Sequence, residues 1–291
     1  MGHRELELGG ADLGELVDST PWQHDPDLLE ARLARDGYLL MRGVLDRDVV
    51  LAARDVVADH AREQGWVEPG PTAPMADGVR GQFLGGLPIT RDPAVLAALE
   101  APALFDLFGL LYGEPVVTFP FKWVRLVGRN EFTGAHLDRV YMGRGSTRLR
   151  TAWVPLGDVP FEQGPLAVCV GSHRLPGFAR MHETYGEVDV DRDLIDGIFT
   201  HDPLEVIGLF GGRWCTSSFE AGDILVFSMN TLHASLDNTT DRARISCDVR
   251  FQPASDPVDE RWVGDNPPGH YSRTSGEKIL SVEEARALWG L

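Results

Sequence analysis

Residues 223–235 read DILVFSMNTLHAS: a short apolar run, a turn and then a histidine. The apolar part, Ile224-Leu225-Val226-Phe227, has the length and composition of a buried strand. Similar runs, separated by Gly, Pro or Asn, recur in the second half of the chain at 115–127, 149–156, 165–170, 214–219 and 244–252. Many short strands with this punctuation predict a sandwich or a barrel.

Residues 26–113 have a helical pattern instead. Apolar residues recur at three- and four-residue steps after Pro26, after the N-capping Asp46, and between Thr90 and Leu111. We therefore predict a single domain over 1–291, mainly β with α. Its core would be a double-stranded β-helix, the jelly-roll or cupin-like barrel that encloses a cavity between two sheets, with the N-terminal helices packed on it.

Changes in composition along the chain mark the boundaries between the parts of this domain. The jelly-roll core would span 114–255, preceded by the helical part and by a loosely attached lead-in, 1–25. Residues 177–212 interrupt the strand pattern, as a lid or substrate loop often does. The tail, 256–291, begins as proline-rich coil and ends in a short helix that Ser281 and Glu284 open as a capping box.

Composition excludes several classes of partner. The formal net charge of −17 and the pI of about 4.9 argue against binding to nucleic acid or to an acidic membrane. No apolar run approaches the roughly 18 residues of a membrane span. The 3 cysteines are widely spaced, and no secretory signal opens the chain, so we expect free thiols in the cytoplasm. The sequence indicates no oligomeric state.

His136-Leu137-Asp138 and the distant His233 are candidate metal ligands. Residues i and i+2 of an extended segment share a face, so His136 and Asp138 can reach one ion. Two imidazoles and one carboxylate form the facial ligand set of Fe(II) and leave the other face of the ion open. The pair alone is not specific, because the chain has 9 histidines and His-x-Asp occurs often by chance.

Arg244 and Ser246 follow His233 on a predicted strand. An arginine in this position suits a bidentate grip on a carboxylate, although a surface strand arginine is the alternative. With the three ligands, it suggests a metal centre that binds an organic acid cosubstrate and activates dioxygen.

Several further motifs stand in a fixed order around these residues. They are 36–45 (DGYLLMRGVL), 152–156 (AWVPL), 164–166 (GPL), 171–174 (GSHR) and 222–223 (GD), with 136–138 (HLD), 233–235 (HAS) and Arg244. This ordered set, over about 30 to 255, resembles the phytanoyl-CoA dioxygenase family of Fe(II)- and 2-oxoglutarate-dependent oxygenases.

The resemblance implies a role for each site residue. His136, Asp138 and His233 would bind Fe(II), and the cosubstrates would be 2-oxoglutarate and O2. The other implied contacts are with 2-oxoglutarate: Arg244 with its distal carboxylate, Ser246 and Ser235 as hydroxyl donors, Trp153 close by, and Gln82 as a further polar contact. Trp153 in core packing is the alternative. Related halogenating enzymes have Gly or Ala at the position of Asp138, so chlorination is disfavoured.

The implied reaction couples decarboxylation of 2-oxoglutarate to succinate with attack on an unactivated C–H bond of a small metabolite. The outcome would be hydroxylation, desaturation, cyclisation or epimerisation, and we favour a substrate from secondary metabolism. The alternatives are a non-catalytic jelly roll that binds a small molecule or a metal, and a helix-rich interaction protein with an inert barrel.

An acidic substrate is suggested by cationic residues, and one tyrosine, near the ligands. Arg139, Tyr141, Lys122 and Arg125 are the candidates for holding a carboxylate or phosphate of the substrate. Arg139 belongs to a loop that also contains Arg144, Arg148 and Arg150. The alternative for this loop is a solvated surface whose arginines pair with the abundant acids.

Overall fold

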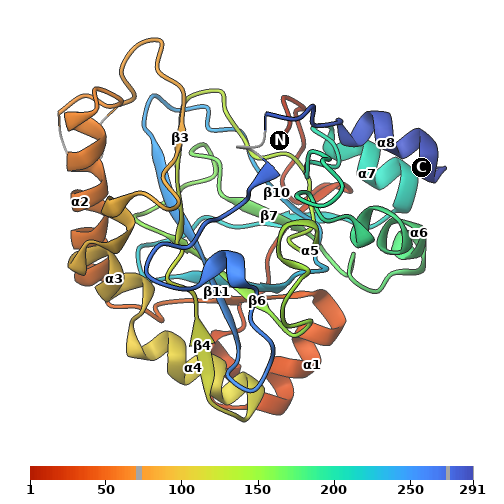
Figure 1. The fold of residues 1–291 in the computed structure, drawn as a ribbon, viewed down its shortest axis with the longest axis horizontal. Helices are drawn as coiled ribbons and strands as arrows, with labels where there is room; N and C mark the ends of the chain where they lie inside the picture. Colours follow the sequence, from red (N-terminus) through yellow and green to blue (C-terminus); the bar gives the residue numbers. More distant parts are fainter. Residues whose placement is uncertain (70–73, 273–275, 291) are drawn as a thin grey trace.

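The computed structural model describes residues 1–69, 74–272 and 276–290. Two β-sheets face each other (Figure 1). The larger has the order β2 (Tyr38–Met41), β9 (Ile224–Ser228), β6 (Arg150–Pro155), β11 (Arg244–Pro253), β5 (Trp123–Val127) and β3 (Gln82–Phe83), and β4 (Val116–Thr118) also pairs with β11. The smaller has the order β1 (Leu13–Glu15), β8 (Trp214–Thr216), β7 (Leu166–Cys169) and β10 (His233–Ser235). This arrangement confirms the jelly roll.

Helices lie outside both sheets. The N-terminal group, along the left and the bottom of Figure 1, comprises α1 (Pro26–Asp36), α2 (Arg47–Glu63), α3 (Pro93–Leu99) and α4 (Pro102–Tyr112). The other group comprises α6 (Ala179–Glu183), α7 (Pro203–Phe210) and α8 (Val282–Trp289), and α5 (Arg139–Met142) lies between the groups. Short 3-10 turns occur at Thr20–Trp22, Pro88–Arg91, Pro176–Phe178, Tyr185–Glu187 and Glu260–Trp262.

Strand β11 lies inside the larger sheet and is buried over all 10 of its residues. Its odd-numbered residues from Ile245 to Phe251 join the core beneath helices α1 to α4. Successive side chains of a strand point to opposite faces, so the even-numbered residues face the other sheet. These are Arg244, Ser246, Asp248, Arg250 and Gln252, which means that β11 has one apolar face and one buried polar face.

Two further apolar clusters complete the layers. Trp153, Leu225 and Phe227 of the larger sheet contact Leu166 and Val168 of the smaller sheet between the two. On the outer face of the smaller sheet, aromatic and aliphatic residues of the 177–212 segment form another cluster with β1, β7, β8 and β10. That segment therefore covers a sheet face, and only a short part of it, near Asp196 and Ile198, reaches the cavity described below.

Several local predictions are confirmed by the structure. The side chain of Asp46 accepts N–H groups at the start of α2, and Ser281 and Glu284 form the expected capping box. Helices α3 and α4 are separate, with the break just before Pro102. The run 115–127 forms two strands, β4 and β5, because a turn at 119–122 divides it.

The prediction of a loosely attached lead-in at 1–25 is wrong. Leu13–Glu15 forms β1, which pairs in parallel with β8. Leu13 is 4% exposed and joins the cluster on the smaller sheet. The start of the chain is also anchored, because the Met1 ammonium lies 2.9 Å from the Asp237 carboxylate. The acidic, glycine-containing composition of this segment concealed a short edge strand.

The expectation that no apolar run approaches the length of a membrane span is wrong, because Pro93–Tyr112 is long and apolar enough to cross a membrane by length and composition alone. In the fold it is divided into α3 and α4, and its apolar side chains, among them Val95, Leu99, Leu104 and Phe108, belong to the core beneath the larger sheet. Core helices pass this test as readily as membrane spans do.

The packing of β1 can be tested by truncating its buried leucine. Leu13→Ala should lower the free energy of unfolding by about 2–5 kcal/mol, because it leaves a cavity in a closed cluster. Val17→Ala is the matched control: Val17 is 54% exposed, and its loss should change stability by less than about 0.5 kcal/mol. Urea unfolding measures both. Equal, small effects would show that the segment contributes nothing to the fold.

Candidate metal centre

His136 and His233 are brought together by the backbone. The N–H of each donates to the carbonyl of the other, at 2.9 Å and 3.1 Å, so that the segment before α5 lies beside β10. Their imidazole rings are 4.1 Å apart between centroids. Two histidines from opposite ends of the core thereby form one face of a site.

Each imidazole is oriented by a backbone carbonyl. Nδ1 of His136 lies 2.8 Å from the Gly134 oxygen, and Nδ1 of His233 lies 3.0 Å from the Thr231 oxygen. A carbonyl only accepts, so both Nδ1 atoms carry a proton, and Nε2 is the nitrogen of each ring that is left for a metal ion. Such outer hydrogen bonds fix the tautomer of metal-binding histidines.

Asp138 completes the group, although not in the predicted extended conformation. Its φ and ψ of −60° and −26° are helical, because α5 begins at the next residue. Its Oδ2 accepts the Thr151 hydroxyl at 2.5 Å, and its Oδ1 accepts Nη2 of Arg250 at 3.0 Å. Oδ1 also lies 4.0 Å from Nε2 of His233, so this is the oxygen that faces the imidazoles.

The protonation states suit a metal ion. Burial, with the neighbouring His233 second, lowers the pKa of His136 to about 3, so this ring is neutral at pH 7. Burial alone would raise the pKa of Asp138, but Arg250 above all, followed by the two imidazoles and Thr151, holds that pKa well below its usual range. The site therefore presents a neutral imidazole and a carboxylate.

The donor atoms of His136, Asp138 and His233 all lie within 4.8 Å of one another, and all three residues are buried. Two imidazole nitrogens and one carboxylate oxygen on one side of an ion leave positions open for other ligands, as in Fe(II) oxygenases. The donor set thus fits a ferrous ion that also binds a cosubstrate.

Arg244 and Ser246 form a site that could accept a carboxylate. Arg244 is 1% exposed, and its Nη1 donates to the Gly164 carbonyl. Its Nε and the Ser246 hydroxyl are buried without a hydrogen-bond partner among the described residues. Burial lowers the pKa of Arg244 to about 10, which leaves it cationic at neutral pH. Two adjacent unpaired donors on one strand face match an anionic acceptor.

The other three residues predicted to contact 2-oxoglutarate differ in their surroundings. Trp153 is buried under Arg244, with the guanidinium 5.8 Å from its ring. The Ser235 hydroxyl already accepts the N–H of Thr133 at 2.8 Å, which ties the ligand segment to β10. The Gln82 amide donates to the Arg80 carbonyl at 2.9 Å, and its neighbour Phe83 lines the cavity in its place.

A cavity of about 470 Å³ opens beside His136 and Asp138. Its walls are mainly aromatic, aliphatic and proline side chains: Phe83, Leu87, Phe121, Trp123, Ile198, Pro267 and Pro268. Its polar members include Arg125, Tyr141, Arg250 and His270. The apolar walls suit a carbon skeleton, and the arginines suit an anionic group.

The four predicted substrate contacts separate into two pairs. Arg125 and Tyr141 line the cavity. Lys122 lies outside this lining, where its ammonium donates to the Phe119 carbonyl at 2.6 Å and pairs with Glu100 at 2.8 Å.

Arg139 also lies outside the cavity lining, because it pairs with Glu187 at 2.7 Å. The other arginines of its loop are paired too: Arg144 with Asp189, Arg148 with Glu114 and Asp256, and Arg150 with Glu30. The structure thus contains the ion pairs that the alternative for this loop expects at these four residues.

Two contacts of Asp138, Thr151 and Arg250, were not predicted from the sequence. They lie directly opposite each other in the pairing of β6 with β11. Their proximity depends on strand register, which requires the three-dimensional pairing. The alternation of polar residues along 244–252 was the available signal, and it pointed to Arg250 as a residue on the same face as Arg244.

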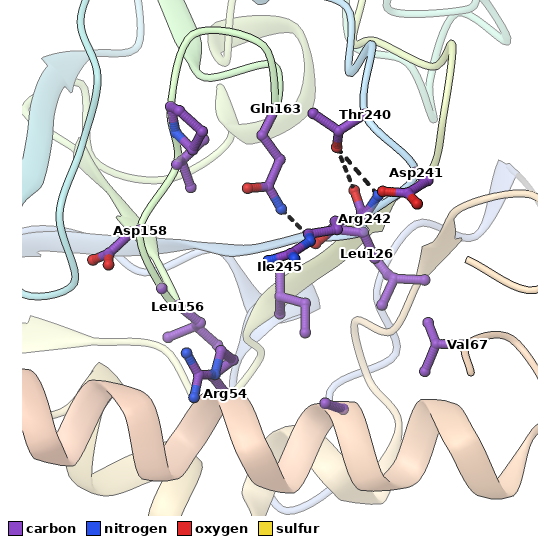
Figure 2. A pocket seen from close by; sticks show the side chains of 15 residues that line it. Arg54, Val67, Leu126, Leu156, Asp158, Gln163, Thr240, Asp241, Arg242 and Ile245 are labelled. Carbon is purple, nitrogen blue, oxygen red and sulfur yellow. Dashed lines mark hydrogen bonds between the residues drawn. The ribbon is translucent and has the colours of Figure 1, made fainter. Parts of the chain in front are cut away.

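A second cavity, of about 460 Å³, lies between α2 and the larger sheet (Figure 2). Leu126, Leu156 and Ile245 line it, on the face of the sheet opposite to Arg244. Two of the charged residues at this cavity are paired: Arg54 with Asp55, and Asp158 with Arg47. None of the three candidate metal ligands lines it.

Comparison with known sequences agrees with this site. A sequence model of the phytanoyl-CoA dioxygenase (PhyH) family matches residues 33–246. Two proteins named 1-deoxypentalenic acid 11-beta-hydroxylase, from Streptomyces exfoliatus and Streptomyces arenae, are each 27% identical over 253 residues. The first alignment covers 84% of this chain and 87% of the relative, and the second covers 83% and 86%.

Comparison with solved structures gives the same fold. The α-ketoglutarate-dependent epimerase SnoN from nogalamycin biosynthesis has a TM-score of 0.55 at 25% identity, covering 80% of this chain and 85% of SnoN. The carbocyclase SnoK from the same biosynthesis has a TM-score of 0.59 at 19% identity, with 91% and 96% covered. EctD from S. alaskensis has a TM-score of 0.57 at 19% identity, with 88% and 91% covered. The chain therefore belongs to the phytanoyl-CoA dioxygenase family and is an Fe(II)- and 2-oxoglutarate-dependent oxygenase.

Proposed function

We propose that His136, Asp138 and His233 bind the ferrous ion and that Arg244 and Ser246 bind the distal carboxylate of 2-oxoglutarate. The observation that carries this proposal is the convergence of three buried donor atoms within 4.8 Å beside a cavity. The unpaired donors of Arg244 and Ser246 support the second part. Trp153 would provide an apolar wall beside Arg244.

The bound iron and 2-oxoglutarate would supply the oxidising chemistry, in which dioxygen is consumed, 2-oxoglutarate is decarboxylated to succinate and an unactivated C–H bond is attacked. The task of the protein is then to orient groups and exclude water. Thr151 and Arg250 hold the Asp138 carboxylate from both sides. Aromatic side chains such as Trp123 and Phe121 close the wall of the cavity.

We further propose that the substrate is a small organic acid whose carboxylate binds Arg125. This arginine lies on the cavity wall, and its side chain is 33% exposed. Its Nε donates to the Asp248 carboxylate over a long distance, 3.4 Å. The guanidinium edge therefore has capacity for another acceptor. The relatives named above act, by name, on a carboxylic acid, which favours the same substrate class.

Hydroxylation is the outcome we favour, because the relatives that match at 27% identity are named hydroxylases. SnoN, an epimerase of nogalamycin biosynthesis, supports a substrate from secondary metabolism. We place the protein in the cytoplasm, where its buried free cysteines, Cys169, Cys215 and Cys247, would remain reduced.

Metal binding tests the core of this proposal. His233→Ala should abolish stoichiometric Fe(II) binding and the formation of succinate from 2-oxoglutarate, because it removes one of three ligands. The loss of affinity should exceed the 10- to 100-fold effect typical of losing an outer hydrogen-bond partner. Anaerobic titration with Fe(II), followed by succinate detection after addition of O2, measures both.

His182→Ala is the matched control for this test. Its ring is partly buried and, like that of His233, bonded to a carbonyl, with Nε2 at 2.8 Å from the Ser172 oxygen, but it lies outside the three-residue donor group. The control should bind one ferrous ion and form succinate as the wild type does. Equal Fe(II) affinity in His233→Ala and the wild type would refute the ligand assignment.

The acid-binding role of Arg125 can be tested by comparing substrate oxidation with the decay of 2-oxoglutarate that occurs without substrate oxidation. Arg125→Met should leave slow, uncoupled decay of 2-oxoglutarate in place and reduce oxidation of an acidic substrate by at least about 10-fold, the cost of one charge-assisted hydrogen bond. Mass spectrometry of candidate organic acids, scored for a gain of one oxygen, identifies the substrate and measures the effect. Arg139→Met, which removes an arginine outside the cavity lining, should oxidise it normally. A stronger effect in Arg139→Met than in Arg125→Met would reverse the assignment.

A further inference from the structure

Arg250 has an unusual environment for an arginine. It is 3% exposed, and its guanidinium lies 4.0 Å from the centre of the Trp123 ring. Nη2 donates to Oδ1 of Asp138 at 3.0 Å and lies 3.9 Å from the Asp248 carboxylate. Arg250 thus joins the candidate metal ligand to the wall of the cavity that it helps to line.

The rest of the guanidinium is not satisfied by the protein. Nε and Nη1 of Arg250 are buried, and neither has a hydrogen-bond partner among the described residues. Stacking on Trp123 favours the cation but offers no lone pair to these N–H groups. An unmet buried donor on a charged group is costly, so its persistence in a buried site points to a ligand that accepts from it.

Arg150 on the adjacent strand shows how the fold satisfies a comparable arginine. Its two terminal nitrogens donate to both oxygens of Glu30, at 2.6 Å and 2.8 Å. Its guanidinium also stacks on an aromatic ring, that of Tyr112, at 4.6 Å. Arg150 therefore both stacks on an aromatic ring and donates to two oxygens of one carboxylate. Arg250 also stacks on an aromatic ring, but Asp138 accepts a hydrogen bond from its Nη2 alone.

Arg244 and Arg250 lie in the same inner row of β11, with Ser246 and Asp248 between them. Both have buried unpaired N–H groups. 2-Oxoglutarate is a dianion with one carboxylate at each end, and Arg244 matches only one of them. Arg250 lies beside the metal ligand Asp138, where the keto-acid end of the cosubstrate would be bound.

We propose that Arg250 is a carboxylate receptor for the keto-acid end of 2-oxoglutarate, held in place by its bond to Asp138. This inference rests on the proposed function of the same site. Arg250 and Arg244 would then bind the two ends of the dianion. Arg250 would balance the charge of Asp138 and the incoming carboxylate, while Arg125 would remain available for the acid group of the substrate.

Two keto acids and two variants distinguish how the protein binds the two ends of 2-oxoglutarate. Pyruvate shares the keto-acid end of 2-oxoglutarate but lacks the distal carboxylate. Calorimetry on the full-length protein first measures the affinity for Mn(II), a redox-stable probe, and then the affinities for 2-oxoglutarate and pyruvate at saturating Mn(II). Arg250→Met should weaken both keto acids by a similar factor of about 10- to 100-fold. Arg244→Met should weaken 2-oxoglutarate by at least 10-fold more than pyruvate.

Mn(II) binding without a keto acid distinguishes this role from simple support of the fold. Arg250→Met removes a positive charge near the ion, which favours Mn(II), and one hydrogen bond to Asp138, which costs up to about 10- to 100-fold in metal affinity. The keto-acid affinities are compared at saturating Mn(II), so a role limited to supporting Asp138 would weaken Mn(II) and leave both keto-acid affinities at their wild-type values. Arg150→Met makes the same chemical change on the neighbouring strand, outside the cavity, and should leave all three affinities within about threefold of wild type.

Arg250→Lys provides a second variant if Arg250→Met does not fold, as judged by circular dichroism. Lysine keeps the charge but not the planar fork, so pyruvate binding should still weaken, to a value between Arg250→Met and the wild type. The inference would be overturned, and the proposed function left standing, if both Arg250 variants folded and bound pyruvate and 2-oxoglutarate with wild-type affinity. If only Arg250→Lys folds, wild-type affinities in that variant would overturn the inference. Failure of the wild type to bind Mn(II) or 2-oxoglutarate would overturn the proposed function and this inference with it.

Discussion

Strand β11 is buried on both faces, and only one of those faces is apolar. The apolar face packs beneath the N-terminal helices and contributes to the largest core cluster. The opposite face places arginines, a serine, an aspartate and a glutamine between the two sheets. Burying polar groups is costly unless each finds a partner. The fold therefore depends on what that inner row binds.

The protein meets only part of this requirement. Five of the nine buried side-chain nitrogen and oxygen atoms that lack a partner in the described part of the chain belong to this one row: Arg244 Nε, Ser246 Oγ, Arg250 Nε and Nη1, and Gln252 Oε1. Such clustering is what an active site produces when its ligands complete its hydrogen bonds. A metal ion on His136, Asp138 and His233, with a dicarboxylate beside it, would supply acceptors for Arg244, Ser246 and Arg250.

The sequence was informative wherever one residue type carries a local signal. Apolar runs located most strands of the core, Asp46 located the start of a helix, and the ordered motifs around His136 and His233 identified the family. It was uninformative wherever function depends on which residues face each other. Thr151 and Arg250 meet Asp138 because β6 and β11 pair in one particular register. Likewise, the sequence left open whether the arginines of 139–150 bind an anion or pair with acids, because their acidic partners come from distant segments.

A crystal structure of the protein with Mn(II) and 2-oxoglutarate, grown without oxygen, tests the central claim most directly. We predict one metal ion on Nε2 of His136, Nε2 of His233 and Oδ1 of Asp138. The 2-oxoglutarate would be bound with Arg244 and Ser246 at its distal carboxylate. A metal ion held elsewhere, or a cosubstrate that leaves those donors of β11 unpaired, would contradict the account.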